Sequence, residues 1–191
     1  MANMGKLNRL ENKVAIVTGA SQGLGQHLAM ELASEGASVV LAARNEGRLK
    51  TISDEITKSG GVAVPVAVDL SQKLDCERLI QTALDAFGGS DILVLNAEPA
   101  TYGKHEELET FDPIKDAMQV NFYGSAYPAY LGIQHIIKRK GLIAYVTSGA
   151  GHLPMAGYLG YTTSKHAMNG FFEALRLEMY SHGVDVLCIN P

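Results

Sequence analysis

The chain has 191 residues, of which 47% are hydrophobic and 19% charged, and its formal net charge is −4. This length fits one domain of roughly 100–200 residues with a sizeable core. The sequence contains no long run of Lys or Arg, so we expect neither a nucleic-acid nor a membrane partner.

Cysteine usage and the first residues bear on the compartment. Only Cys76 and Cys188 occur, far apart, which favours a reduced compartment over a disulfide framework. We interpret Cys188 as core and Cys76 as a residue at a helix start. Residues 1–13 are polar and mixed, unlike a signal peptide, and no stretch approaches the ~20 apolar residues of a membrane helix. We therefore expect a soluble, cytoplasmic protein.

Short apolar, β-branched runs alternate with helix-like segments along the chain. The runs predict strands at residues 14–18, 38–43, 62–68, 91–95, 142–147 and 184–189. The segments between them predict helices near residues 24–34, 46–58, 76–87, 113–138 and 157–181. This alternation indicates an α/β fold with a doubly wound parallel sheet, Rossmann-like, with helices on both faces. Without a repeat or linker, residues 1–191 form one domain.

The fourth predicted helix contains a proline. Pro128 costs about 3 kcal/mol or more in a helix interior, and Gly124 is nearby, so we expect a kink or break there. 

The first strand runs into a glycine-rich turn and then a helix. Glycines let the backbone turn tightly and approach a pyrophosphate, and the helix start offers free N–H groups and a positive dipole end. The sequence therefore predicts a dinucleotide site at this turn, although a purely structural turn is the alternative. The residues concerned are Thr18, Gly19, Ser21, Gln22, Gly23, Leu24 and Gly25.

The end of the second strand bears on the choice of cofactor. An acidic residue there would hold a ribose 2′-hydroxyl, whereas an arginine accommodates a 2′-phosphate. The strand ends at Arg44 and Asn45, with no carboxylate before Glu46. Arg44 offers a planar fork for phosphate, so we predict that NADP(H) is preferred over NAD(H). The alternative is a solvated arginine before a helix that Asn45 caps.

Tyr161 and Lys165 lie four residues apart, and Ser148 precedes the tyrosine by thirteen residues. Residues four apart share one face of a helix, so a phenol and an ammonium would meet there. A free tyrosine titrates near pH 10, and a neighbouring cation lowers its pKa. With Ser148 holding a substrate oxygen, these three residues suit proton transfer at a carbonyl or an alcohol.

The ordered set of these motifs resembles the short-chain dehydrogenase/reductase family over nearly the whole chain, with a weaker similarity to hydroxysteroid-dehydrogenase-like members around residues 148–172. The residues that carry the resemblance are the turn at 18–25, Asp69, Leu70, Asn96, Ala97, Asn121, Ser148, Tyr161 and Lys165. The resemblance implies an oxidoreductase that acts on the CH–OH group of its donors.

The resemblance also implies a role for each of these positions. Asp69 and Leu70 would contact the adenine, and Asn96 and Ala97 would lie along the cofactor. Ser148 would bind the substrate oxygen, and Tyr161 would be the acid/base. Lys165 would hold the nicotinamide ribose and lower the pKa of Tyr161, while Asn121 would position a water that feeds protons toward Lys165. Each residue also has an ordinary structural alternative, such as capping or packing.

Two departures from the family pattern stand out. After the fourth strand the family usually reads Asn-Asn-Ala-Gly, whereas this chain has Glu98 in place of the glycine. That residue puts the local backbone and cofactor affinity in question, unless it faces solvent. The chain also stops at Pro191, directly after the sixth strand, so we expect either a fragment or a domain that lacks its C-terminal lid and last strand.

The loop after Ser148 would border the substrate. Leu153, Met155 and Tyr158 suggest a pocket for an apolar ketone or alcohol, with loop packing or a subunit contact as the alternative. The last helix carries a wide apolar stripe, part of which core packing explains. The resemblance implies that this helix also pairs across an interface, in a homodimer or homotetramer. No cluster has metal-ligand spacing, so no metal is implied. Two functions stay open: a hydride-transferring oxidoreductase, or a catalytically weak or inactive nucleotide-binding sensor or scaffold.

Overall fold

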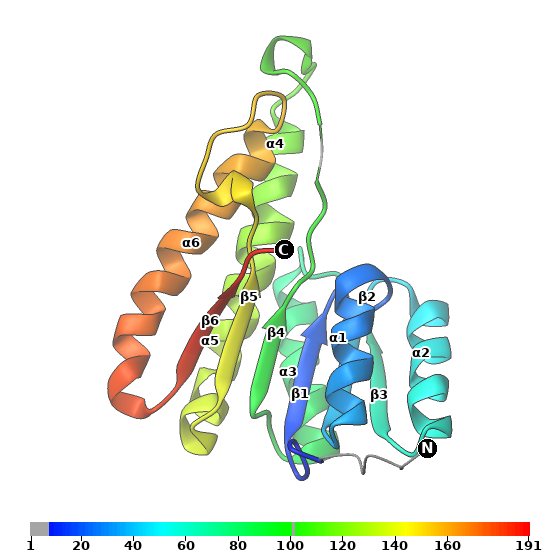
Figure 1. Cartoon of the computed structure of the whole chain (residues 1–191). Helices are drawn as coiled ribbons and strands as arrows, with labels where there is room; N and C mark the ends of the chain where they lie inside the picture. The colour runs from blue at the N-terminus through cyan, green and yellow to red at the C-terminus, as the bar shows by residue number, and fades with distance from the viewer. Residues whose placement is uncertain (1–7, 101) are drawn as a thin grey trace, which may run out of the picture.

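The computed structural model describes residues 8–100 and 102–191, and its centre is one parallel sheet (Figure 1). The six strands lie in the order β3-β2-β1-β4-β5-β6, and each neighbouring pair is parallel. They are β1 (Val14–Thr18), β2 (Ser38–Ala43), β3 (Val62–Ala67), β4 (Ile92–Leu95), β5 (Leu142–Val146) and β6 (Asp185–Ile189). The predicted doubly wound α/β sheet is confirmed, and residues 1–7 of the N-terminal stretch lie outside the described residues.

Helices cover both faces of the sheet, because successive strand residues point to opposite faces and pack in two hydrophobic cores. The helices are α1 (Gly23–Ser34), α2 (Glu46–Lys58), α3 (Lys73–Phe87), α4 (Asp112–Ala117), α5 (Gly124–Arg139) and α6 (Leu159–Met179). Short 3-10 turns lie at His105–Glu107, Gly149–Gly151 and Tyr180–His182. Helices α1 and α2 pack on one face, and α3, α5 and α6 pack on the other.

The chain order puts a topological switch point between β1 and β4, where open α/β sheets bind their ligands in a crevice. From β1 the strands proceed outward to β2 and β3, and the chain then returns to β4 on the other side of β1. At such a switch point the loops leaving the carboxyl ends of the two strands diverge and leave room for a ligand. Thr18 ends β1 and Asn96 follows β4, so both predicted residues lie at this edge.

The predicted fourth helix is irregular, but the irregular segment lies before Pro128 and not at it. A π-helical segment, Met118–Tyr123, separates α4 from α5, whereas Pro128 lies inside α5. Pro128 is the fifth residue of α5, and its missing N–H costs the helix the single bond to the Gly124 carbonyl, while α5 continues through it. The expected kink is therefore a wide turn upstream, and it contains Asn121.

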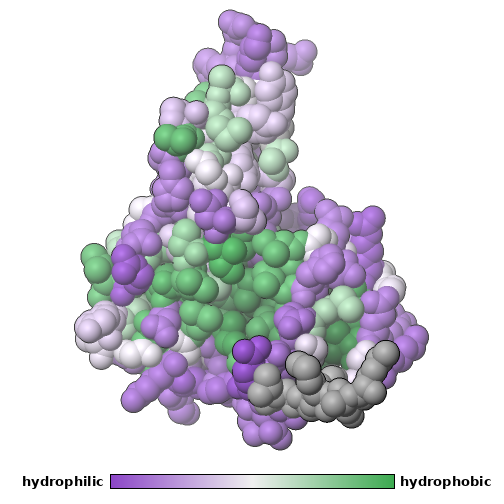
Figure 2. Space-filling model, in the orientation of Figure 1, coloured by the Kyte–Doolittle hydropathy of each residue, from purple (hydrophilic) through white to green (hydrophobic). Residues whose placement is uncertain are grey.

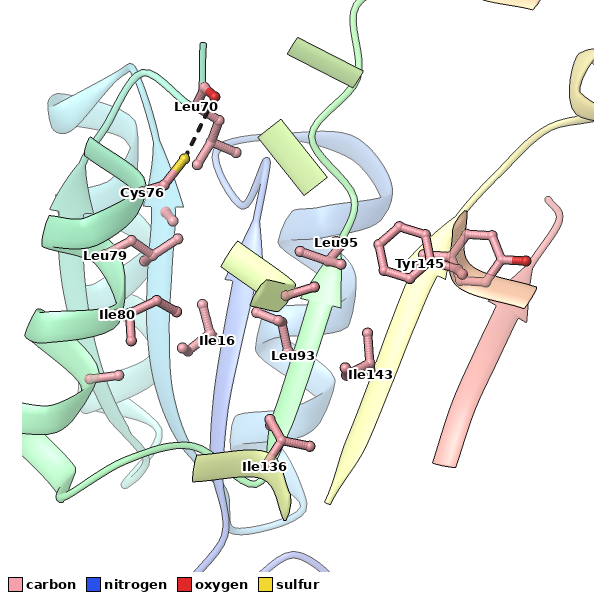
Figure 3. Packing of buried hydrophobic residues seen from close by; sticks show 14 of the residues in the cluster. Ile16, Leu70, Cys76, Leu79, Ile80, Leu93, Leu95, Ile136, Ile143 and Tyr145 are labelled. Atoms are coloured by element: carbon pink, nitrogen blue, oxygen red, sulfur yellow. Dashed lines mark hydrogen bonds between the residues drawn. The ribbon is translucent and has the colours of Figure 1, made fainter. Parts of the chain in front are cut away.

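One core cluster fills the space between the sheet and helices α3, α5 and α6 (Figure 3). Leu93 and Ile143 of the sheet lie among its buried side chains, as does Tyr145, which stacks on Phe172 at 4.6 Å between ring centroids. Cys76 is fully buried, and its Sγ lies 3.6 Å from the Leu70 carbonyl oxygen. Burial and nearby carboxylates, Asp75 first, raise the pKa of Cys76 to about 11, so this thiol is unreactive at neutral pH.

A hydrophobic surface lies beside α1 on the opposite face of the sheet, over β4, β5 and β6 (Figure 2). Leu187 of β6 is 50% exposed there, while Leu142 and Ile189 are half-buried at the edge of the second core. The two helices on this face make their sheet contacts with β1, β2 and β3. Within the described residues, none of the helices is long and apolar enough to span a membrane.

A buried carboxylate joins three segments at the end of the sheet opposite the crevice. Asp91 Oδ2 accepts from the Val14 N–H at 3.0 Å and from Arg139 Nη1 at 2.7 Å, and Oδ1 lies 3.2 Å from Lys13 Nζ. Burial by itself raises the pKa of Asp91, but the bonds from Val14, Arg139 and Lys13 outweigh it and hold the pKa below its usual value. Asp91 therefore stabilises the fold in its charged form.

We expect Asp91→Asn to lower the free energy of unfolding by about 2–3 kcal/mol at pH 7, since it breaks a largely buried ion pair. A depressed native pKa gives stability above the unfolded pKa near ~3.9 that is lost as pH falls. The difference between wild type and variant should therefore shrink below about pH 4. Urea unfolding across pH measures it, with the exposed Asp112→Asn as control; equal stabilities at pH 7 would contradict the assignment.

Candidate functional site

The glycine-rich turn is packed closely against the end of β4. Gly19 has a φ of +67°, and a Cβ there would lie 2.8 Å from Asn96 Nδ2. A Cβ on Gly25 would lie 2.4 Å from the same nitrogen and from the Gly19 carbonyl oxygen. At Gly23, with a φ of +57°, a Cβ would meet nothing within 4 Å. Gly19 and Gly25 thus let the two segments pack closely, while Gly23 leaves open space at the start of α1, as a phosphate site at a helix N-terminus requires.

Thr18 and Asn96 hold this turn in place. Thr18 Oγ1 accepts from the backbone N–H groups of Asn96 at 2.9 Å and Ala97 at 3.2 Å, and it donates to the Val94 carbonyl at 3.2 Å. Asn96 Nδ2 donates to the Thr18 carbonyl at 3.2 Å. These bonds use buried polar groups that would otherwise be unpaired. Thr18 and Asn96 therefore brace the walls of the crevice.

The rim beside the turn carries two arginines, of which the sequence predicted one. Arg44 is exposed after β2, and Asn45 caps α2 by accepting from the Arg48 N–H at 2.9 Å. Arg48 Nη1 donates to Gln22 Oε1 at 2.6 Å and lines a groove of about 460 Å³ together with Ser21 and Gln22. Arg48 was missed because only the fold brings the first turn of α2 beside residue 22.

Asp69 and Leu70 follow β3 at the adenine side of the predicted site. Asp69 Oδ1 accepts from the Ser71 N–H at 3.0 Å, and the Asp69 N–H donates to Asp75 Oδ2 at 2.7 Å. The Leu70 side chain is 5% exposed and belongs to the core. Any contact of Leu70 with an adenine would therefore involve its backbone. A separate groove of about 560 Å³ between α1 and α2 includes only Leu24 of the predicted site residues.

Ser148, Tyr161 and Lys165 come together at the carboxyl end of β5. Ser148 follows the strand and caps a 3-10 turn, with its Oγ accepting from the Ala150 N–H at 3.2 Å. Tyr161 and Lys165 lie one turn apart on α6, and the Lys165 Nζ lies 5.5 Å from the Tyr161 ring centroid. Lys165 is 1% exposed and donates to the Val146 carbonyl at 2.7 Å.

Glu98 changes the electrostatics of this group. Its carboxylate, 28% exposed, forms an ion pair with Lys165. Burial raises the pKa of Tyr161; the hydrogen bond with Ser148 lowers it, while the charge of Glu98 and a hydrogen bond with Glu98 raise it further. The net direction is upward, which differs from the expectation that Lys165 lowers this pKa. The first physical reason is burial, which disfavours the charged phenolate, and the negative charge of Glu98 adds to it. Burial lowers the pKa of Lys165, and Glu98 partly offsets this.

Asn121 lies in the π-helical segment and is fully buried. Its Nδ2 donates to the Pro99 carbonyl at 3.2 Å and to Ser164 Oγ at 2.9 Å. Ser164 Oγ in turn donates to the Tyr161 carbonyl at 2.7 Å. The Asn121 Oδ1 is buried without a hydrogen-bond partner. Asn121 thus ties the loop after β4 to α6, and its side-chain oxygen Oδ1 is free to accept a hydrogen bond from a bridging water.

Two loops stand above Ser148, Tyr161 and Lys165, and both carry aromatic residues. The Gly103 N–H donates to the Gly157 carbonyl at 2.8 Å, which joins the loop after β4 to the loop before α6. Tyr158 lies between Tyr102 and Tyr161, with ring centroids 5.2 Å and 6.4 Å apart. In the same loop Leu153 is 70% exposed and Met155 46% exposed. The loop before α6 therefore presents two exposed apolar side chains. Within residues 8–100 and 102–191, no group of three or more acidic, His or Cys residues could hold a metal.

Comparisons with known proteins agree with this geometry. A family model described as short chain dehydrogenase matches residues 13–191. The chain is 38% identical over 184 residues to 11-beta-hydroxysteroid dehydrogenase-like 4A of Arabidopsis thaliana, a match that covers 96% of this chain and 61% of the relative. The chain therefore spans less than two thirds of the length of that relative.

Solved structures with bound nucleotides share the fold. A metagenomic short-chain oxidoreductase in complex with NADP has a TM-score of 0.90 and 33% identity, with 95% of this chain and 83% of that chain covered. A short chain dehydrogenase/reductase from Burkholderia phymatum in complex with NAD has a TM-score of 0.87 and 30% identity, with 95% and 65% covered. Proteins similar to this chain therefore bind either NADP or NAD.

Proposed function

The chain belongs to the short-chain dehydrogenase family, and from this premise we propose that it transfers a hydride between NADP(H) and a carbonyl or secondary alcohol. The observation that carries the proposal is the meeting of Ser148, Tyr161 and Lys165 beside the crevice at the end of β1 and β4. The nicotinamide supplies the hydride when the cofactor is bound, and the protein supplies orientation and proton transfer.

The chain's own residues divide the remaining work. In reduction, negative charge develops on the substrate oxygen, and Ser148 and Tyr161 are the donors that would stabilise it. Tyr161 gives its phenolic proton to that oxygen and takes it back in oxidation. Lys165, held by the Val146 carbonyl, would bind the nicotinamide ribose. Asn121 would position the water that returns protons toward Lys165.

The cofactor would lie along the turn and the rim. Gly23 and the start of α1 would take the pyrophosphate, and Asn96 and Ala97 would border the nicotinamide side. Arg44 would bind the 2′-phosphate, with Arg48 beside it, and this pair of cations supports a preference for NADP(H) over NAD(H). Asp69 and the Leu70 backbone would border the adenine.

The exposed side chains of Leu153 and Met155 support an apolar substrate. We expect bulky apolar ketones, such as steroid-like or long-chain ketones, to give kcat/KM values at least about tenfold above small polar ketones, since each buried methylene contributes about 0.8 kcal/mol. A ketone panel with NADPH oxidation as readout measures this. Faster turnover of the small polar ketones would contradict the apolar pocket, and no turnover of any ketone would favour a nucleotide sensor or scaffold instead.

We also propose a homo-oligomer, built on the outer face of α6. The predicted stripe is partly core, because Met168, Phe172 and Met179 are buried. Leu177, on the same helix, is 73% exposed, and a contact between copies on this face would bury it. Light scattering at micromolar concentration should give at least twice the monomer mass of 20.4 kDa, and a monomer-sized species would contradict this.

A further inference from the structure

Glu98 stands where the family pattern has a glycine, and its position is defined by its neighbours. The next residue, Pro99, accepts through its carbonyl from the buried Asn121 Nδ2 at 3.2 Å. Asn121 is itself fixed by Ser164. Among the described residues, the non-glycine positions with positive φ are Asn8, Asn12 and Lys140, so residue 98 needs no glycine for its backbone. The glutamate side chain is therefore accommodated without backbone strain.

The carboxylate of Glu98 acts on two residues of the proposed catalytic group. It forms an ion pair with Lys165, and its charge raises the pKa of Tyr161. Lys165 is almost fully buried, and a buried ammonium is costly without a partner of opposite charge. Glu98, at 28% exposure, is the carboxylate that supplies this charge and also reaches solvent.

Lys165 is the residue that the proposed function assigns to the nicotinamide ribose, and Tyr161 beside it is the proposed acid/base. We propose that Glu98 is a built-in competitor of the cofactor: its carboxylate occupies the ammonium of Lys165, which would bind the ribose, and must turn away for NADP(H) to bind. This inference rests on the proposed function. Residue 98 therefore sets the affinity of the protein for its cofactor.

The competition has a predictable size. When only a fraction of the molecules presents a free site, the apparent dissociation constant rises by the inverse of that fraction. An exchange of one partly exposed ion pair for ribose contacts corresponds to roughly a tenfold change in affinity. Removing the carboxylate should therefore tighten cofactor binding, although it leaves Lys165 without its counter-charge and lowers the stability of the ligand-free protein.

The test compares two substitutions by direct titration with NADPH, followed by the fluorescence of the bound nicotinamide. Glu98→Gln keeps the size and removes the charge, and Glu98→Gly removes both. Each should bind NADPH about tenfold more tightly than wild type. Glu106→Gln, an exposed glutamate of the same loop, is the matched control and should bind as wild type does. An equal gain in Glu106→Gln would overturn the proposal, because the effect would then be general electrostatics.

Thermal unfolding separates competition from a merely structural role. Without NADPH, both Glu98 variants should unfold at a lower temperature than wild type, and saturating NADPH should raise their midpoints by more than it raises that of wild type. Unchanged or weaker NADPH binding by both variants, with wild type binding normally, overturns the competition and leaves the proposed function intact. If neither wild type nor either variant binds NADPH, both the competition and the proposed function are overturned. If the Glu98 variants bind NADPH more tightly but no protein turns over a ketone, only the proposed function is overturned.

Discussion

Replacing Tyr161 with phenylalanine is expected to lower kcat for ketone reduction by about 10³-fold at neutral pH, the range that a positioned acid contributes. The substitution removes the phenolic proton while keeping the ring that packs on Tyr158. It also removes the hydroxyl partner of Ser148 and Glu98 but leaves the turn at residues 18–25 untouched. NADPH should therefore still bind, and single-turnover kinetics with a ketone would show the loss in the chemical step.

The matched control for this result is Tyr180→Phe, because Tyr180 is 86% exposed at the far end of α6. Its kcat should equal that of wild type. Since burial raises the pKa of Tyr161, reduction should hold its rate to a higher pH than a free phenol allows and fall only as the phenol ionises. A Tyr161→Phe enzyme that reduces ketones at the wild-type rate would refute the assigned acid.

The second large effect is expected on cofactor affinity, from Arg44 beside the glycine-rich turn. Arg44→Asp should weaken NADPH binding by about 100-fold, since a charge-assisted hydrogen bond contributes about 1.5–3 kcal/mol and the new carboxylate repels the phosphate. NADH, which lacks the 2′-phosphate, should bind as well as before or better, because an acidic residue at this position can hold a ribose hydroxyl. Titration with both nucleotides measures the change in their ratio.

Two further arginine variants show whether the effect is local. Arg48→Ala should weaken NADPH binding less than Arg44→Asp, because Arg48 is partly engaged with Gln22. Arg176 lies near the far end of α6 and pairs with Glu173, so Arg176→Ala should leave the binding of both nucleotides unchanged. Tighter binding of NADH than of NADPH by the wild-type protein would contradict the predicted preference.

Much of this site could be predicted because its residues follow from local patterns. The strand-turn-helix at residues 14–34 and the Tyr161–Lys165 spacing are each encoded within one short segment. The order of the strands then brings these segments to the same edge of the sheet, as parallel strands require. The predicted strands agree with the observed ones to within a residue at each end, and α3 begins three residues before its predicted start.

The remaining features depend on contacts between distant residues. The pairing of Glu98 with Lys165 joins positions 67 residues apart, and Arg48 meets Gln22 across 26 residues. Neither pairing has a periodicity that a sequence displays. The departure from the family's glycine was visible at position 98, but its meeting with a buried ammonium was not. Pro128 drew attention to the wrong turn of the helix, because a π-helical segment has no comparable marker residue.

The central claim is hydride transfer at the Tyr161 site. Its most direct test uses NADPH that carries deuterium at the transferable position of the nicotinamide, with a bulky apolar ketone as acceptor. We predict that the wild-type protein yields an alcohol with deuterium on the carbinol carbon, and that Tyr161→Phe yields almost none in the same time. Tight NADPH binding with no deuterium in the alcohol of any ketone tried would contradict the claim.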